Sequence, residues 1–382
     1  RYGIGAAAVE YSDRLPKYIR ITDISDDGRY SPEKPVSVNN IFSENYFLSE
    51  GDLVVARTGA SVGKSYLYKL KDGPLVFAGF LICLTADRDT LLPQYLEAYL
   101  KTKSYWSWVK VTSMRSGQPG INGNEYSRLL IPLPEITEQR IINKALSEAD
   151  TLIEKLEKLI EKKNNIKQGA MQELLTGKRR LPGFSAEWEA KKLGDLFSLA
   201  ASYSKSKFIN DGGTYLIMDM GSVSSVGKNI SSKRTFLSSD LLQTGDLVMP
   251  KDDIGGGNII GKVAYVDRND KYILGDHVYK LTAKTPEINT LFFSYLINSN
   301  AVSIRLKKKV AGSAQLGLGR KSVEDEDVYF PKDKDEQVSI ASVLSDMDTE
   351  IEKLESQLTK YRNIKQGMMQ VLLTGKIRLL SK

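Results

Sequence analysis

The sequence contains one stretch twice. The first copy runs from Thr137 to Leu181 and reads TEQRIINKALSEADTLIEKLEKLIEKKNNIKQGAMQELLTGKRRL. The second copy begins 198 residues later, runs from Asp335 to Leu379, and reads DEQVSIASVLSDMDTEIEKLESQLTKYRNIKQGMMQVLLTGKIRL. The two copies align without a gap, and more than half of their positions are identical. The chain therefore carries an internal duplication.

Both copies have the apolar spacing of a helix that packs against another helix. Steps of four and three residues alternate, which gives a heptad seam, and Glu and Lys fill the positions between. The residues that we expect to pair are Ile142, Leu146, Ala149, Ile153, Leu156 and Ile160 in the first copy, and Ile340, Leu344, Met347, Ile351, Leu354 and Leu358 in the second. Two equivalent helices can cover each other's apolar stripe, so we expect an antiparallel coiled coil. The alternative is that each helix packs onto its own neighbouring globular block.

Each predicted helix has a start and a stop signal. Thr137 and Asp335 are the expected N-caps, and Gly177 and Gly375 are the expected residues past the helix ends. A helix of about 40 residues is roughly 60 Å long at a rise of 1.5 Å per residue.

Composition excludes several classes of protein. A chain of 382 residues suits two or three domains. We find no run of 18 apolar residues and no secretory signal, so we expect no membrane contact and a cytoplasmic location.

Cys83 and His277 are the sole cysteine and histidine, which argues against disulfides, Cys/His zinc sites and duplicated histidine-dependent catalysis. We therefore expect no metal and no cofactor. The net charge of +7 points weakly to a polyanionic partner.

A globular block precedes each copy of the repeat. The first block has strand-like runs at Tyr18–Ile24 and Phe77–Thr85, a strand, loop, strand unit from Phe47 to Tyr68, and a helix opened by Pro93. The second block, from Trp188 to about Pro331, repeats that order with lower identity. The predicted fold is α+β, with a pseudo-two-fold internal duplication. The expected domains are a first globular block at 1–134, a first long helix at 135–180, a second globular block at 181–331, and a second long helix at 332–382.

The motif TGASVGKS, Thr58 to Ser65, resembles a phosphate-binding loop but departs from its spacing. Only three residues separate Gly59 from the Gly-Lys pair, and a strand-like run follows where a helix is needed. We therefore disfavour nucleotide hydrolysis. Two interpretations stay open: a hairpin that brings backbone amides and Lys64 to a DNA phosphate, or a plain tight loop.

Basic, glycine-rich loops precede both long helices, and they are the main candidates for DNA contact. Arg can pair with guanine, Gln and Asn with adenine, and Lys with phosphate. Together with the hairpin loops, the candidate residues are Arg57, Thr58, Ser61, Lys64, Arg115, Gln118 and Asn122 in the first block, and Lys251, Asn258, Lys262, Arg305, Lys307, Gln315 and Arg320 in the second. The alternative for each residue is a solvated face.

Other residues are interpreted as structural. We expect Tyr105, Trp106 and Trp108 to belong to the core and His277 to be a structural polar residue. The acidic run Glu324 to Asp327 lacks nuclease spacing, and the chain has neither a Pro-Pro pair nor a G-x-G-x-x-G motif after a strand. We therefore expect a non-catalytic protein.

The sequence resembles the specificity (S) subunits of Type I restriction-modification enzymes over nearly its whole length. The motifs that carry the resemblance are IEKLE and IKQGxMQxLLTGK in both helices, the linker PGFSAEWEAKKLGDL and the hairpin GDLVVARTGASVGK. The first block departs from the pattern because it has no counterpart of EWEAKKLGDL.

The resemblance implies a division of labour. Two target-recognition domains, held apart by two antiparallel helices, would each read one half of a bipartite site in double-stranded DNA. The helices would dock methyltransferase (M) subunits, expected to be two because the two helix faces are near-equivalent. Restriction (R) subunits would join through those, so methyl transfer, ATP hydrolysis and cleavage would belong to partners. The competing hypotheses are a coiled-coil scaffold with protein-binding ends and an ATP-binding switch.

Overall fold

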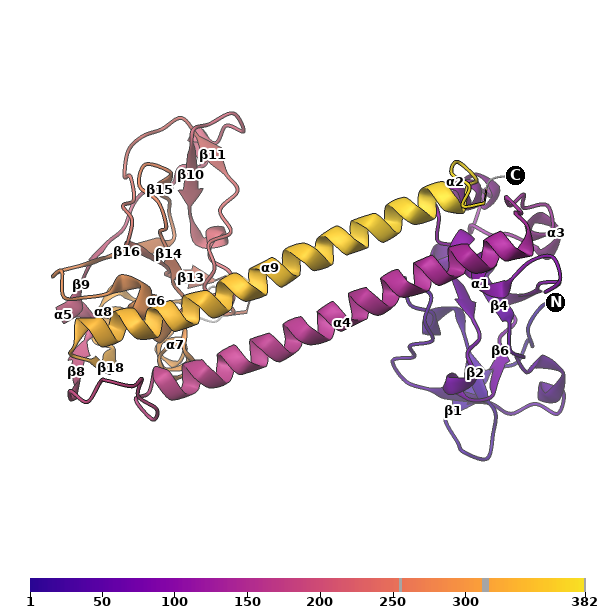
Figure 1. Ribbon diagram of the computed structural model, residues 1–382, viewed down its shortest axis with the longest axis horizontal. Helices are drawn as coiled ribbons and strands as arrows, with labels where there is room; N and C mark the ends of the chain where they lie inside the picture. Colours follow the sequence, from indigo (N-terminus) through magenta and orange to yellow (C-terminus); the bar gives the residue numbers. More distant parts are fainter. Residues whose placement is uncertain (254–255, 311–315, 381–382) are drawn as a thin grey trace. The chain divides into compact units, whose positions relative to one another are not determined.

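Each copy of the repeated stretch forms one long helix in the structure, a computed structural model that describes residues 1–253, 256–310 and 316–380 (Figure 1). The first helix is α4 (Ile136–Leu174) and the second is α9 (Lys334–Leu372), and each has 39 residues. Both begin one residue before the expected cap, so Thr137 and Asp335 lie in the first turn instead of capping it. Gly177 and Gly375 follow the helix ends with φ of +71°, a left-handed conformation that favours glycine.

The chain divides into two units, and the division passes through both long helices. Unit 1 comprises Arg1–Lys158 and Ser356–Lys382, and unit 2 comprises Leu159–Glu355. Each unit therefore contains one globular block, one part of α4 and one part of α9.

Unit 1 contains two small sheets and three short helices. The first sheet has the order β1-β3-β2-β6 and the second the order β5-β4-β7. Their strands are β1 (Ala8–Glu10), β2 (Lys17–Ile19), β3 (Val36–Val38), β6 (Leu75–Phe77), β5 (Ser65–Leu67), β4 (Asp52–Ala56) and β7 (Leu81–Thr85), and the helices are α1 (Pro93–Tyr99), α2 (Lys103–Thr112) and α3 (Gly123–Tyr126).

Unit 2 repeats this arrangement and adds to it. The sheets have the orders β11-β10-β15, β14-β12-β16-β9, β13-β17 and β18-β8. Their strands are β11 (Arg234–Thr235), β10 (Tyr215–Met218), β15 (Tyr272–Leu274), β14 (Ala264–Tyr265), β12 (Leu247–Pro250), β16 (Val278–Ala283), β9 (Phe197–Ala200), β13 (Asp252–Asp253), β17 (Leu316–Gly317), β18 (Asp327–Pro331) and β8 (Trp188–Lys192), and the helices are α5 (Leu193–Leu196), α6 (Thr290–Asn298), α7 (Asn300–Lys308) and α8 (Arg320–Glu324). The parallel pair β2–β6 of unit 1 corresponds to the parallel pair β10–β15.

Two predicted elements differ from the structure. The run Phe77–Thr85 is not one strand, because the chain turns at Ala78–Phe80 between β6 and β7. The helix that Pro93 opens ends at Tyr99, and Thr102 caps a second helix by accepting a hydrogen bond from the Tyr105 amide. Interruption by a capping residue explains the break, since a Thr side chain satisfies an otherwise unpaired amide.

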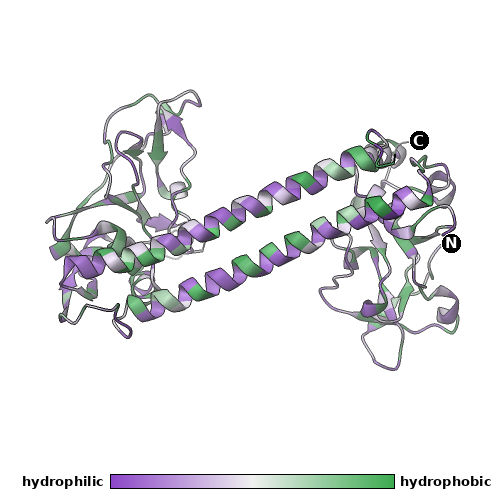
Figure 2. Cartoon of the chain, viewed as in Figure 1, coloured by the Kyte–Doolittle hydropathy of each residue, from purple (hydrophilic) through white to green (hydrophobic). Residues whose placement is uncertain are grey.

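The expected helix pairing is confirmed. Every one of the ten residues most central to the seam is buried or half-buried: Ile142, Leu146, Ile153, Leu156, Ile160, Ile340, Leu344, Ile351, Leu354 and Leu358. Apolar and polar residues are interspersed along both helices (Figure 2). The alternative also holds in part, because the first turns of each helix enter the core of the block before them. Ile142 belongs to one buried cluster with Tyr95 and with Leu372 from the end of α9, and Ile340 belongs to another with Phe293 and with Leu174 from the end of α4.

Ion pairs fix the antiparallel register. In unit 1, Lys365 of α9 pairs with Asp150 of α4. In unit 2, Lys167 of α4 pairs with Asp348 of α9 at 2.5 Å. Lys365 and Lys167 occupy the same position of the repeat, and so do Asp150 and Asp348, so the two pairs differ only in which copy supplies the lysine. An isologous contact requires such an exchange, so the register is self-consistent at both places.

Candidate nucleic-acid interface

Three loops meet at one end of the globular block in unit 1. They are residues 57–61 after β4, residues 78–80 before β7, and residues 113–121 after α2. The Arg57 amide donates to the Phe80 carbonyl at 3.0 Å, and the Ile121 amide donates to the Arg57 carbonyl at 2.8 Å. A β-bridge joins Thr58 to Gly120. Backbone pairing therefore brings both predicted loops together, and we call this region the three-loop end.

Unit 2 builds the same three-loop end from residues 251–253, 275–277 and 316–318. The Lys251 amide donates to the His277 carbonyl at 3.0 Å, and the Leu318 amide donates to the Lys251 carbonyl at 2.7 Å. The strand pair β13–β17 aligns Asp252 with Gly317. These bonds correspond one to one with those of unit 1, so Lys251 stands where Arg57 stands and His277 stands where Phe80 stands.

Some predicted residues lie at the three-loop end of unit 1 with side chains available for contact. The Arg57 guanidinium stacks over the Tyr2 ring at 5.1 Å. Gly59 has φ of +74°, and a Cβ built there would lie 3.0 Å from the Gln118 amide nitrogen, so this loop requires glycine beneath Gln118. Thr58 and Ser61 are partly exposed on either side of Gly59.

Two other predicted residues of unit 1 hold the loop in shape. Asn122 is the N-cap of α3: its side chain accepts from the Glu125 amide at 3.0 Å, and the Glu125 carboxylate accepts from the Asn122 amide at 2.8 Å. Arg115 donates to the Thr112 and Met114 carbonyls, each at 2.9 Å, and pairs with Glu125. Both side chains already have partners within the block.

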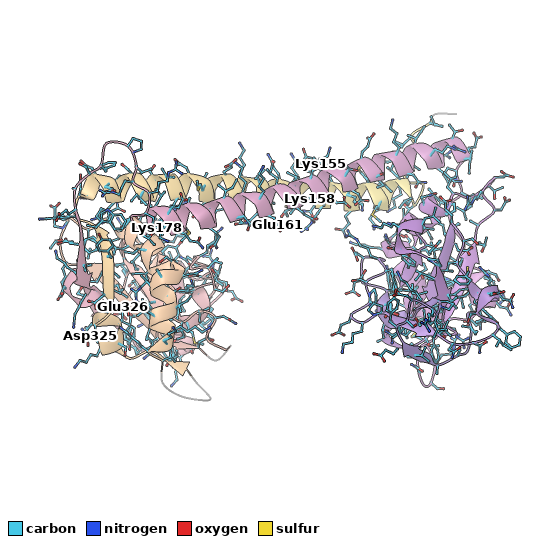
Figure 3. The ribbon with its side chains drawn as sticks, turned by 90° about the horizontal axis from the view of Figure 1, so that it is seen from below. Lys155, Lys158, Glu161, Lys178, Asp325 and Glu326 are labelled. Carbon is cyan, nitrogen blue, oxygen red and sulfur yellow. The ribbon has the colours of Figure 1, made fainter. Side chains whose placement is uncertain are left out.

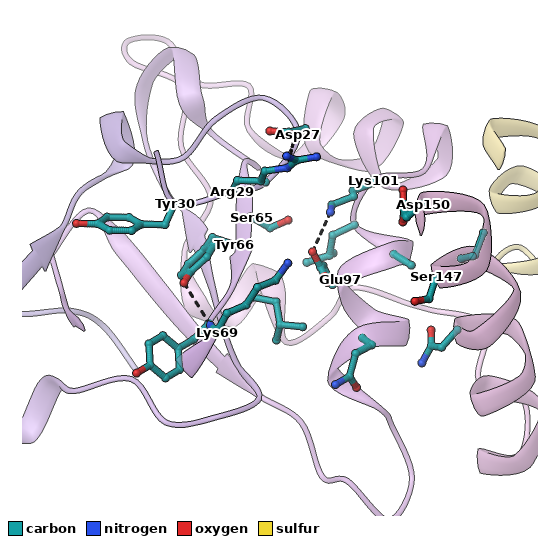
Figure 4. A pocket seen from close by; sticks show the side chains of 18 of the residues that line it. Asp27, Arg29, Tyr30, Ser65, Tyr66, Lys69, Glu97, Lys101, Ser147 and Asp150 are labelled. Atoms are coloured by element: carbon teal, nitrogen blue, oxygen red, sulfur yellow. Dashed lines mark hydrogen bonds and ion pairs between the residues drawn. The ribbon is translucent and has the colours of Figure 1, made fainter. Parts of the chain in front are cut away.

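Lys64 lines an open groove of unit 1, which has a volume of about 1130 Å³. Figure 4 shows other residues that line this groove, among them Arg29 and Lys101. Its ammonium lies 2.6 Å from Asp26. Further charges in the groove also pair with one another, Arg29 with Asp27 at 2.7 Å and Lys101 with Glu97 at 2.8 Å. A groove whose cations are matched by carboxylates is poorly suited to a polyanion.

Basic residues of unit 2 also have internal partners. Lys262 donates to the Asn298 carbonyl at 2.8 Å, and burial lowers the pKa of its ammonium. Arg305 pairs with the buried carboxylate of Glu326 at 2.6 Å.

Four predicted residues of unit 2 complete the set. Arg320 pairs with Glu324 at 2.7 Å along α8, and Lys307 is exposed on α7. Asn258 takes part in interactions within the block. Gln315 lies outside the described residues.

Two turn residues that the sequence did not single out as DNA contacts, Phe80 and His277, also lie at the three-loop end. His277, expected to be a structural polar residue, has its Nδ1 atom 2.7 Å from the Asp252 carboxylate, its side chain is 48% exposed and its φ is +57°. Phe80 is 60% exposed. The one signal in the sequence was that each residue comes directly before a strand. That signal can be recognised only when the preceding turn is known. The aromatic cluster follows its prediction more closely: Tyr105 is fully buried and Trp108 half-buried, whereas Trp106 is 41% exposed.

The described residues offer neither a cluster of metal ligands nor a membrane-spanning helix. Within residues 1–253, 256–310 and 316–380, no group of three or more His, Cys, Asp or Glu side chains is placed to hold a metal ion. Over the same residues no helix combines the length and apolarity that crossing a membrane requires.

Comparison with known proteins identifies the family. The model of the Type I restriction modification DNA specificity domain matches residues 14–168 and again residues 185–360. The MjaVIII specificity subunit of Methanocaldococcus jannaschii, a Type I restriction enzyme subunit, is 26% identical over 89% of this chain and 82% of its own length. The putative MjaX specificity subunit of the same organism is 24% identical over 98% of this chain and 90% of its own length.

Solved structures agree on the fold. The S subunit of a Type I restriction-modification system from M. genitalium superposes with a TM-score of 0.61 at 16% identity, covering 96% of this chain and 93% of that one. A chain from a study of the assembly and conformational transition of a Type I system gives a TM-score of 0.57 at 14% identity, covering 98% and 96%. Because the domain model matches twice and spans most of the sequence, the chain belongs to the Type I restriction-modification DNA specificity family, whose specificity subunits are non-catalytic.

Proposed function

We propose that each globular block of this DNA specificity subunit reads one half of a bipartite site through its three-loop end. The observation that carries the proposal is the recurrence of that end in both units with the same backbone bonds. Loops carried on a rigid scaffold are the usual place for recognition. The same scaffold therefore presents two sets of side chains.

The side chains at equivalent positions differ, which suits two different half-sites. Unit 1 presents Arg57 and Thr58 where unit 2 presents Lys251 and Asp252. The Arg57 guanidinium can pair with guanine through two hydrogen bonds, whereas the Asp252 carboxylate lies 2.7 Å from the His277 ring. Equivalent backbones with different hydrogen-bonding groups would select different bases.

We further propose that the paired helices dock two methyltransferase subunits, through which restriction subunits join in the cytoplasm. An exposed patch occurs identically in both copies of the repeat. It comprises Ile166, Gln168 and Gly169 in α4 and Ile364, Gln366 and Gly367 in α9. A Cβ on either glycine would meet nothing within 4 Å, so a partner can approach the backbone closely. Two identical patches fit two copies of one partner.

The helices would also set the unread spacer between the half-sites. Each helix is continuous over 39 residues, about 58 Å at 1.5 Å per residue. Charged side chains such as Lys155, Lys158 and Glu161 project from α4 into solvent (Figure 3). A solvated helix with a buried seam keeps its length without needing another domain to cover it.

A domain exchange tests the proposal. Residues 188–331 are replaced by the corresponding block of another specificity subunit, and methylated sites are mapped in cells that carry the matching methyltransferase. We expect one half-site to change while the other half-site and the spacer stay the same. The reciprocal replacement of residues 1–134 is the control and should change the other half. A methylated sequence that stays unchanged after either exchange would contradict the proposal.

A further inference from the structure

The turn before β7 in unit 1, and before β16 in unit 2, places one exposed ring at each three-loop end. Phe80 accepts from the Arg57 amide, and His277 accepts from the Lys251 amide, both through the carbonyl at 3.0 Å. Each ring is thus fixed by its backbone to the residue that starts the first loop. The two positions are structurally equivalent, but one ring is apolar and the other can hydrogen-bond.

His277 is held in a conformation that a β-carbon disfavours. Its φ of +57° lies in the left-handed region, which non-glycine residues rarely adopt and which costs about 1 kcal/mol or more. Burial does not explain this conformation, because the side chain is 48% exposed. Asp270 of the same unit has a similar φ of +55°, so the conformation alone assigns no function to the ring; it places an exposed side chain at the three-loop end.

Asp252 orients the ring. The Nδ1 atom of His277 lies 2.7 Å from the Asp252 carboxylate, so Nδ1 carries the proton and donates it. The Nε2 atom is 3.9 Å from Asp276, which is too far for a hydrogen bond. Nε2 therefore stays available for an outside partner, and Asp252 is a positioning residue.

We propose that position 80 in unit 1 and position 277 in unit 2 contact base edges and help to determine each half-site, an inference that rests on the proposed function. Phe80 would contact a thymine methyl group, and His277 would hydrogen-bond a base edge through Nε2. Both contacts belong to the major-groove pattern that distinguishes all four base pairs. The different rings then contribute to reading different sequences from equivalent scaffolds.

The test uses the full-length subunit with its methyltransferase and a DNA library in which both half-sites are randomised. The variant His277→Asn removes the ring and keeps a residue type that tolerates left-handed backbone. Asp270→Asn is the matched control, since Asp270 is exposed and has φ of +55°. Phe80→His tests the equivalent position, and thermal unfolding of each variant checks the fold.

We expect His277→Asn to reduce discrimination at one base pair of the second half-site by roughly tenfold or more. The first half-site should keep its sequence, and Asp270→Asn should bind as the parent does. Asp252→Asn should weaken discrimination at the same base pair, because it releases the ring. Phe80→His should change one base pair of the first half-site alone.

Two results would overturn the inference. One is unchanged base preference in folded His277→Asn, and the other is an equal loss of affinity for all sequences, which indicates a phosphate contact. Neither result contradicts the proposed function, which fails if exchange of residues 188–331 or of residues 1–134 leaves the methylated sequence unchanged.

Discussion

A buried glutamate near the start of each long helix is tied to an arginine just past the end of the other. Glu138 is 1% exposed, and its carboxylate accepts two hydrogen bonds from the Arg378 Nε at 2.9 and 3.0 Å and one from Nη2 at 2.6 Å. Glu336 and Arg180 form the same pair in unit 2. A buried carboxylate is tolerated because a guanidinium satisfies both oxygens.

Stability should therefore depend on pH through Glu138. The hydrogen bond from Arg378 holds the pKa of this carboxylate below its usual value of 4.5. A carboxylate with a lowered folded pKa contributes stability above the unfolded pKa, and this contribution is lost as pH falls through the folded value. Glu138→Gln should lower the free energy of unfolding by about 2 kcal/mol at pH 7. The difference from the parent should shrink below about pH 4.5.

Urea unfolding at pH 7 and at pH 3.5 measures both effects. The control is Glu148→Gln on the same helix, because Glu148 is 70% exposed and lies 4.0 Å from Lys144. Its exchange should leave stability unchanged at either pH. An equal destabilisation by Glu138→Gln at both pH values would show that the ion pair is not responsible.

Residues of the first candidate interface should separate into those that shape the loop and those that contact DNA. Asn122→Ala removes the cap of α3 and should lower the free energy of unfolding by about 1 kcal/mol. Gln118→Ala should change stability by less than about 0.5 kcal/mol, because Gln118 is exposed, but should weaken DNA binding. Urea unfolding and fluorescence anisotropy at fixed salt distinguish the two. Loss of DNA discrimination in Asn122→Ala at unchanged stability would reverse this assignment.

At the scale of elements, the sequence predicted what depends on periodicity and missed what depends on turns. The seams of α4 and α9 follow heptads, so the helices and their pairing were predictable. The turn at Ala78–Phe80 was not, because its residues belong to a continuous apolar run, FAGFLICLT. The meeting of the loops around Arg57 and Gly120 was also beyond the sequence, since it depends on a bridge between residues about 60 positions apart.

The repeated helix patch makes a prediction about partner number. Ile166 is 48% exposed in α4, and Ile364 is 42% exposed in α9. Ile166→Glu or Ile364→Glu alone should leave a complex with one methyltransferase subunit, and the double variant should bind none, since a charge is costly at the centre of an interface. Native mass spectrometry of the purified complexes counts the subunits.

Leu152→Glu is the control for the patch variants. Leu152 is 37% exposed on α4, but its repeat counterpart is Glu350, so it belongs to no duplicated surface. This variant should keep both methyltransferase subunits. Two bound subunits in the double patch variant would place the docking surface elsewhere.

For the whole molecule, duplication explains why the helices have changed less than the blocks. Some ion pairs between α4 and α9 occur twice with the copies exchanged, so the residue types at these repeat positions are constrained by contacts in both units. Lys365 with Asp150 and Lys167 with Asp348 illustrate this coupling. The three-loop ends are free of it, because Phe80 and His277 contact their own blocks and can diverge independently.

The same coupling determines how the spacer can be changed. A seven-residue insertion after Leu159 in α4 alone would shift the register of every residue pair beyond it. A matching insertion after Gln357, the repeat-equivalent position in α9, would preserve the residue pairs on both sides of the insertions. Seven residues add about 10.5 Å, which corresponds to roughly three base pairs at about 3.4 Å per step. Mapping of methylated sites should show a longer spacer with both half-sites unchanged for the double insertion, and loss of activity for the single one. An unaltered spacer after the double insertion would mean that something other than helix length sets the distance between the half-sites.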